Sequence, residues 1–127
     1  MIRRYDSGAA FLAENQAFLH TKPQISAFMV LDAPLLEKTD KINYAARCEK
    51  DGKTLLAMKV EPYHLQLFGD ADCAGELLDF LVRGGYEIQN YLSEKTLGDA
   101  AAREMEARFG IRYEEALAMA FMEARTL

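Results

Sequence analysis

The sequence has few of the residues that metal sites and disulfide frameworks require. It contains two histidines, His20 and His64, and two cysteines, Cys48 and Cys73. Neither pair has the Cys-x-x-Cys or His-x-x-x-His spacing of a zinc site, so no metal ligands are predicted. The cysteines stand far apart in a chain without signs of export, which predicts reduced thiols rather than a disulfide. Cys48 lies in a predicted strand, where a free cysteine usually acts as a small core hydrophobe.

The chain also lacks a cationic excess and a long apolar run. Fifteen basic and 20 acidic residues give a formal net charge of −5, which disfavours a nucleic-acid partner. Arg3-Arg4 is the only basic doublet, too little for a polybasic membrane anchor. No apolar run approaches the roughly 20 residues that span a bilayer. Asp6 and Glu14 precede any continuous apolar stretch, so the amino terminus does not resemble a secretory signal, and we expect a cytoplasmic protein without a membrane partner.

Internal repeats, low-complexity tracts and linkers are absent from the sequence. The 127 residues are 50% hydrophobic, enough for one sizeable core. We therefore expect residues 1–127 to form a single domain.

Two helices are predicted near the amino terminus. Ser7 is a plausible N-cap, and an apolar helical face continues to about Leu19. Pro23 ends or follows this helix. A second helix is marked by apolar residues from Ile25 to Leu36, with Asp32-Ala33-Pro34 near its end.

A β-hairpin and a third strand are predicted next. Asp51-Gly52 separates two strand-like runs, Tyr44–Glu49 and Thr54–Val60, and predicts a tight turn. Pro62 lacks an amide donor and ends the second strand. The alternating run from His64 to Phe68 predicts the third strand, closed by Gly69.

The remaining chain predicts two more helices and two more strands. A helix over Ala74–Arg83 stops at Gly84-Gly85, and another over Leu97–Phe109 stops at Gly110. Between them, a strand is expected from Tyr86 and Ile88 towards Tyr91-Leu92. Arg112–Leu127 is ambiguous, because its composition favours a helix whereas Leu117, Met119 and Phe121 alternate as in a strand.

This order resembles the amino-terminal domain of two-domain acetyltransferases of the GCN5-related N-acetyltransferase (GNAT) superfamily. The resemblance covers nearly the whole chain and is carried by the hairpin, by Pro62 after it and by the LLDFL helix, Leu77–Leu81. It implies an α/β (α+β) fold with a mixed, mainly antiparallel sheet flanked by helices in the order ααβββαβαβ, and it implies a strand for Arg112–Leu127.

The resemblance also locates the segment that would bind a cofactor. GNAT domains hold the pyrophosphate of coenzyme A on a loop patterned Gln/Arg-x-x-Gly-x-Gly/Ala before a helix. The corresponding segment here, Gly69–Gly75, lacks that pattern, and Asp70 and Asp72 would oppose phosphates and suit helix capping instead. Lys95–Ala100 matches except at its first position, but it follows the fourth predicted strand rather than the third. No cofactor-binding residue is predicted in this chain.

Other catalytic groupings are weak. Cys73, Asp72 and His64 could be imagined as a nucleophile, an acid and a base, but a surface histidine and a partly buried thiol are the simpler interpretation. Tyr63 and Tyr86 are expected to pack on the sheet. The helix around Glu104 and Glu106, with its arginines Arg103 and Arg108, is expected to be a solvated face with intrahelical ion pairs. No catalytic residue is predicted.

The resemblance implies that the full-length protein transfers an acetyl group from acetyl-coenzyme A to an amine. A carboxy-terminal catalytic domain would bind the cofactor, and the present chain would be non-catalytic and wall one side of the acceptor site. Pro62-Tyr63-His64 and Gly69–Gly75 lie at strand ends, where a cleft between the domains is expected. Two alternatives are a stand-alone interaction or homodimerisation module and a small hydrolase that uses Cys73 with a depressed pKa.

Overall fold

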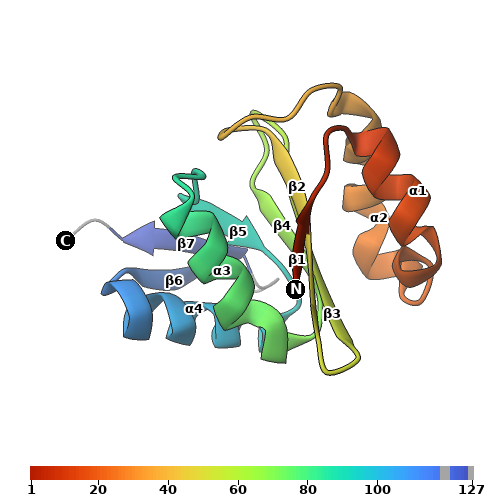
Figure 1. Ribbon diagram of the computed structural model, residues 1–127. Coiled ribbons are helices and arrows are strands. Elements are labelled where there is room, and N and C mark those ends of the chain that lie inside the picture. The colour runs from red at the N-terminus through yellow and green to blue at the C-terminus, as the bar shows by residue number, and fades with distance from the viewer. Residues whose placement is uncertain (118–120, 126–127) are drawn as a thin grey trace.

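The computed structural model describes residues 1–117 and 121–125, which form a mixed sheet with helices on both of its faces (Figure 1). The described part of the sheet has seven strands in the order β1-β2-β3-β4-β5-β7-β6. Neighbouring strands run antiparallel except β4 and β5, which run parallel. The mixed, mainly antiparallel α/β class predicted from the sequence is confirmed.

The amino-terminal segment adds one strand to the predicted pair of helices. Strand β1 (Ile2–Arg4) pairs with β2, and the helices are α1 (Gly8–Leu19) and α2 (Pro23–Asp32), followed by the 3₁₀ turn η1 (Ala33–Leu35). The Ser7 hydroxyl accepts a hydrogen bond from the amide of Ala10 at 3.2 Å, which confirms the predicted N-cap. Pro23 begins α2, where its missing amide leaves no helical bond unmade.

The central hairpin forms where it was predicted. Strands β2 (Tyr44–Lys50) and β3 (Lys53–Lys59) are joined by Asp51 and Gly52, which have φ values of 53° and 78°. Two successive positive φ angles are typical of the type I′ turn that suits the twist of a hairpin. Strand β4 (Leu65–Gly69) pairs with β3, so the third predicted strand is also confirmed.

The second half contains the two predicted helices, but its first strand is shorter than predicted. After the turn η2 (Ala71–Cys73) come α3 (Ala74–Arg83), β5 (Asn90–Leu92) and α4 (Lys95–Phe109), which ends at left-handed Gly110. The expectation that Tyr86 and Ile88 belong to the strand is wrong. The amide of Tyr86 instead donates to the carbonyl of Leu81, which holds this segment against the end of α3.

The last segment forms a hairpin rather than a single strand. Strands β6 (Arg112–Leu117) and β7 (Phe121–Arg125) pair with each other, and β7 also pairs with β5. Strand pairing therefore prevails over the helical propensity of this composition. Met119, which the alternating pattern included, lies outside the described residues, as do residues 126–127.

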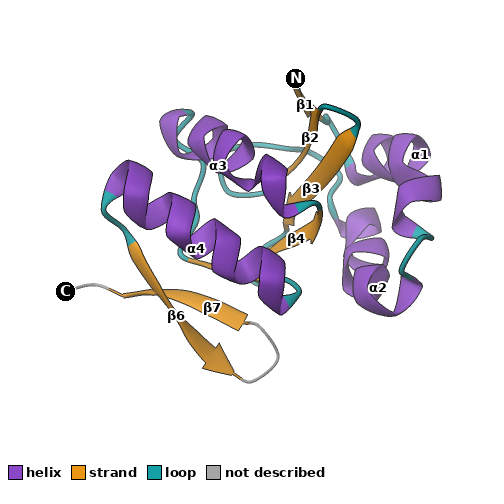
Figure 2. Ribbon diagram, turned by 90° about the horizontal axis from the view of Figure 1, so that it is seen from below, coloured by secondary structure: helices purple, strands orange, loops and turns teal. Residues whose placement is uncertain are grey.

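Each face of the sheet carries its own core. The two helical layers, α1 with α2 and α3 with α4, lie on opposite sides of strands β1–β4 in Figure 2. Alternation along β3 supplies both cores, because Leu55 and Ala57 pack towards α3 and α4 while Leu56 and Met58 pack towards α1 and α2. Cys48 and Cys73 are free thiols, buried on the side of α3 and α4. Among the described residues, no helix has the length and apolar character needed to span a membrane.

Candidate ligand groove

A groove opens where β4 and β5 separate. The two strands pair only through Leu65 with Tyr91 and Gln66 with Leu92, after which β4 continues to Gly69 while the other strand leads into α4. The groove has a volume of about 440 Å³. Its apolar walls come from α2 and from the ends of both strands, and they include Ile25, Phe28, Met29, Leu67, Phe68 and Leu92.

Most polar side chains that line this groove already have partners. The Gln66 amide is largely buried and donates from Nε2 to the Asp32 carboxylate at 2.8 Å. The Ser26 hydroxyl donates to the carbonyl of Leu19 at 2.6 Å. The Lys95 ammonium lies 3.5 Å from the Asp99 carboxylate, one helical turn along α4. These contacts use polar groups that would otherwise face a ligand.

A second hollow adjoins the groove and shares Phe68 and Glu94 with it. Its volume is about 400 Å³, and it lies between the β2–β3 turn, the end of α1 and the end of β4. Lys22, in the connection between α1 and α2, lines this second hollow, and its Nζ lies 3.6 Å from Oε1 of Glu94. This ion pair therefore lies where the two hollows meet.

The turn between β4 and α3 satisfies its own polar groups. Oδ1 of Asp70 accepts the amide of Asp72 at 2.9 Å, and the Asp70 carbonyl accepts the amide of Cys73 at 3.2 Å. The predicted capping role is confirmed for Asp70. Asp72 does something else, because its carboxylate binds the Lys53 ammonium, and this contact holds the pKa of Asp72 below its ordinary value.

Helix α4 covers the amino-terminal turn of α3. A Cβ atom added to Gly75 would lie 2.6 Å from Oε1 of Glu104 and 2.8 Å from Nη2 of Arg108. Arg108 also lies 3.3 Å from Glu104 and 3.5 Å from Asp79, so these side chains form one ion-pair group over the helix start. The predicted intrahelical pairing on α4 is thus present between Glu104 and Arg108.

The groove has the size and mainly apolar lining of a small-molecule site. Comparisons with protein-family models, with curated proteins and with solved structures found no match. A shared fold would in any case leave function open, since unrelated activities occur on one fold. The function of this chain therefore rests on the geometry of the groove and of the adjacent turn.

The second segment considered for phosphate binding is helical. Lys95–Ala100 forms the start of α4, and the Gly98 carbonyl accepts a hydrogen bond from the Tyr91 hydroxyl at 2.9 Å. The amide of Gly98 donates to the Glu94 carbonyl at 2.8 Å, so this amide is already used within the first turn of the helix. The expectation that this segment does not bind phosphate stays a prediction.

Cys73, Asp72 and His64 are directed to different partners. His64 Nδ1 lies 2.7 Å from Oδ1 of Asn90, just before the start of β4, whereas Cys73 lies beyond its end. A five-residue strand is about 16 Å long, which separates the two side chains. Burial raises the pKa of the Cys73 thiol. Burial is also the main cause that raises the pKa of the Cys48 thiol, to about 12. The alternative of a Cys73 hydrolase required a depressed pKa and is not supported.

The two tyrosines considered for acid–base chemistry differ in their surroundings. Tyr63 follows β3 and is 51% exposed, so the expectation that it packs on the sheet is wrong. Tyr86 is buried, and its ring packs edge-on against Tyr44 with the ring centroids 4.7 Å apart. Its hydroxyl accepts a hydrogen bond from Arg4. Packing explains Tyr86, although it lies outside any strand.

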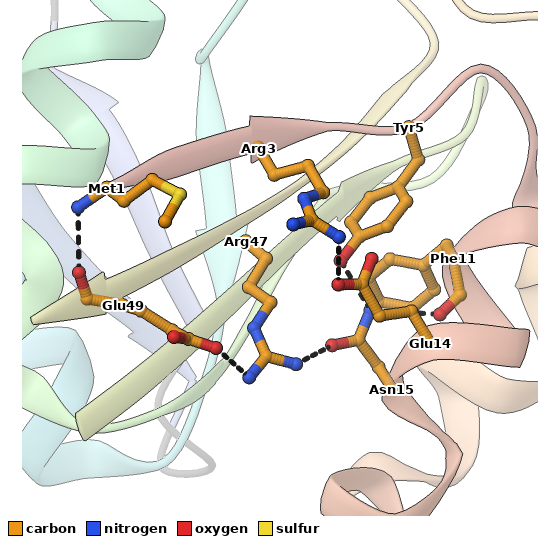
Figure 3. A network of polar contacts seen from close by, with 8 residues as sticks. All are labelled: Met1, Arg3, Tyr5, Phe11, Glu14, Asn15, Arg47 and Glu49. Carbon is orange, nitrogen blue, oxygen red and sulfur yellow. Dashed lines mark hydrogen bonds and ion pairs between the residues drawn. The ribbon is translucent and has the colours of Figure 1, made fainter. Parts of the chain in front are cut away.

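A second group of polar side chains joins α1 to β1 and β2, as Figure 3 shows. Asn15 is fully buried, donates to the Tyr5 hydroxyl at 3.0 Å and accepts from Arg47 at 2.7 Å. Arg3 binds Glu14, and Arg47 also binds Glu49. The space among these side chains is about 30 Å³, too small for more than a water molecule. This group fastens the helix to the sheet.

Sequence reasoning did not single out the residues that form the groove. Gln66 and Glu94 lie more than 25 positions apart, and they come together only because β4 and β5 run parallel and then diverge. Within the described residues, no group of three or more His, Cys, Asp or Glu side chains could hold a metal ion.

Proposed function

We propose that this chain is an N-acetyltransferase-like domain of the GNAT type that does not bind coenzyme A and that contributes a wall of the acceptor site. A separate catalytic domain of the full-length protein would hold acetyl-coenzyme A. Support comes from the order of the elements, since every predicted helix and strand occurs in the predicted order, with β1 and β7 in addition.

The turn between β4 and α3 is the observation that carries this proposal. A pyrophosphate bound there would need free backbone amides as donors and a positive electrostatic potential. The Asp70 carboxylate already accepts the Asp72 amide, and Asp72 adds a second negative charge, which Lys53 binds. Two carboxylates beside two phosphates would repel them. These contacts support a turn that is capped by its own side chain rather than by a cofactor.

The groove is suited to the acceptor rather than to the cofactor. Its apolar walls would exclude water from the body of a small molecule, and Glu94 lies at one end of it. In the proposed full-length enzyme, acetyl-coenzyme A held by the catalytic domain would supply the acetyl group to the acceptor nitrogen, with the coenzyme A thiolate as the leaving group. The catalytic domain would supply the proton-transfer groups, while this chain orients the amine.

One observation favours the alternative, an interaction or homodimerisation module. Helix α2 and the turn after it expose three large apolar side chains, Phe28 at 62%, Leu31 at 68% and Leu35 at 60%. Exposed apolar groups that lie together often mark a protein interface. Sedimentation equilibrium of the wild type and of Leu31→Glu tests this alternative, which requires an association that the charged variant loses.

Calorimetric titration with acetyl-coenzyme A tests the main proposal. We expect no saturable heat with millimolar ligand. The matched variant Asp70→Asn/Asp72→Asn removes both charges but retains side chains that can cap amides. If the carboxylates are the obstacle, this variant gains weak affinity that the wild type lacks. Saturable binding by the wild type would overturn the proposal.

A further inference from the structure

Glu94 has an unusual place among the charged residues of the groove. It lines both hollows, and it is the only carboxylate among the described residues that line the larger one. Its neighbour in that lining, Lys95, has its ammonium 3.5 Å from the Asp99 carboxylate. The apolar space thus has one carboxylate at its junction with the second hollow.

The partner of Glu94 is an ammonium group from this same chain. Lys22 approaches from the connection between α1 and α2, and its Nζ lies 3.6 Å from the Glu94 carboxylate. The side chains are 56% and 40% exposed, respectively. Ion pairs this open to solvent contribute little to stability, because water and salt compete with them. A ligand ammonium could therefore replace Lys22 at small cost.

We propose that the groove binds a small primary amine with an apolar body, that Glu94 recognises its ammonium group, and that Lys22 occupies Glu94 in the free protein. The apolar body would lie against Phe28, Met29 and Phe68, which line the same space. Phe28 is 62% exposed, so a ligand that covers it would remove apolar surface from water.

The other charged groups near the groove are consistent with a preference for a cationic ligand. Asp32 is occupied by the Gln66 amide, and Lys53 is occupied by Asp72. If a ligand displaces Lys22 from Glu94, the Lys22 ammonium can move into the second hollow. Asp70 also lines that hollow and carries a negative charge. An anionic ligand in the groove would be repelled by the Glu94 carboxylate.

This inference rests on the proposed role of the groove as an acceptor site, but its test needs no cofactor. The probes are 2-phenylethylamine, 2-phenylethanol and 3-phenylpropionate, which share a ring and differ in charge. We expect calorimetry or NMR titration to show that the amine binds about tenfold more tightly than the alcohol, and that the acid binds most weakly.

Two single substitutions separate the roles of the ion pair. Glu94→Gln keeps the shape of the side chain and should remove the preference for the amine over the alcohol. Lys22→Met keeps the aliphatic stem and should tighten amine binding several-fold, because it removes the internal competitor. Thermal melting followed by circular dichroism establishes that both variants remain folded.

Three results would overturn the inference: no binding of the amine to the wild type, equal affinities for amine and alcohol, or an unchanged preference in Glu94→Gln. Weaker amine binding by Lys22→Met would refute the competitor role of Lys22. Acetyl-coenzyme A titration of the same samples keeps the two proposals distinct, since cofactor binding contradicts the proposed function and leaves amine recognition by Glu94 standing.

Discussion

At the scale of single residues, the two thiols show how burial suppresses chemistry. Cys48 and Cys73 are both fully buried, and burial raises the pKa of each thiol, which would have to ionise to react. Cys48 also donates a long hydrogen bond, 3.5 Å, to the Glu76 carboxylate, which disfavours a second negative charge beside it. Both thiols are therefore core groups rather than nucleophiles.

We predict slow alkylation of both thiols in the folded protein. The pKa of Cys48 is about 12 against an ordinary value of 9.0, so at pH 7 its thiolate is about a thousandfold scarcer than that of an unfolded chain. Mass spectrometry after timed iodoacetamide treatment, with urea-unfolded protein as the control, measures the ratio of rates. A fast reaction of Cys73 in the folded state would revive the hydrolase alternative.

The same raised pKa has a consequence for stability. Below pH 9 the Cys48 thiol is protonated in both the folded and the unfolded chain, so its contribution is fully present. As the pH rises from 9 towards 12, the unfolded chain loses this proton first, and the free energy of unfolding falls. Cys48→Ala should make that fall shallower.

At the scale of elements, α1 is placed by a close backbone approach as well as by polar contacts. The amide of Gly8 donates to the Leu36 carbonyl at 2.6 Å, and a Cβ atom added to Gly8 would lie 1.6 Å from the Ala33 carbonyl oxygen. Only glycine lets the start of α1 lie this near to η1. The buried Asn15 then holds the same helix to β2 through Arg47.

We predict that Gly8→Ala destabilises the protein more than Gly85→Ala does. The first substitution forces backbone apart and should cost about 3 kcal/mol or more. Gly85 has a φ of 78° but nothing within 4 Å of an added Cβ, so only the left-handed strain of about 1–2 kcal/mol applies. Urea unfolding of both variants compares the costs. Equal losses would show that α1 can shift away from η1.

At the scale of the whole molecule, one sheet joins two cores that do not share side chains. Met29 and Phe68 belong to the core beneath α1 and α2, whereas Leu65 and Leu78 belong to the core beneath α3 and α4. Strand β4 contributes alternate residues to each. Loss of either core would leave one face of the central strands without cover, which couples the two layers.

We predict that the two layers unfold together. Met29→Ala and Leu78→Ala alter different cores, and each should cost about 2–5 kcal/mol and lower a single transition. Far-ultraviolet circular dichroism and tyrosine signals should give the same midpoint for each variant. Two separate transitions, with each variant moving only one, would show that the helical layers are independent.

The sequence predicted the caps and turns that depend on a few neighbouring residues. The Ser7 cap, the Asp51-Gly52 turn and Gly110 each appear in the structure where the sequence indicated them. Strand β1 was not predicted, because its three residues have no pattern of their own and gain their structure by pairing with β2.

The candidate site could not be predicted in the same way. The groove depends on the parallel pairing of β4 with β5 and on their separation after two residue pairs. Glu94 and Lys22 become neighbours only through that arrangement. The Asp70 cap of the β4–α3 turn, in contrast, was predicted from the sequence, since an aspartate just before a helical turn accepts its free amides.

The difference between the hairpin and the groove also determines where this protein can change over evolutionary time. Five of the seven residues of β3 are buried, so most substitutions there would disturb one core or the other. Phe28 and Glu94 line the groove and Lys22 lies beside it, where replacements affect what binds far more than whether the chain folds. New ligand preferences could therefore arise by a few substitutions at the groove's edge while the scaffold stays constant.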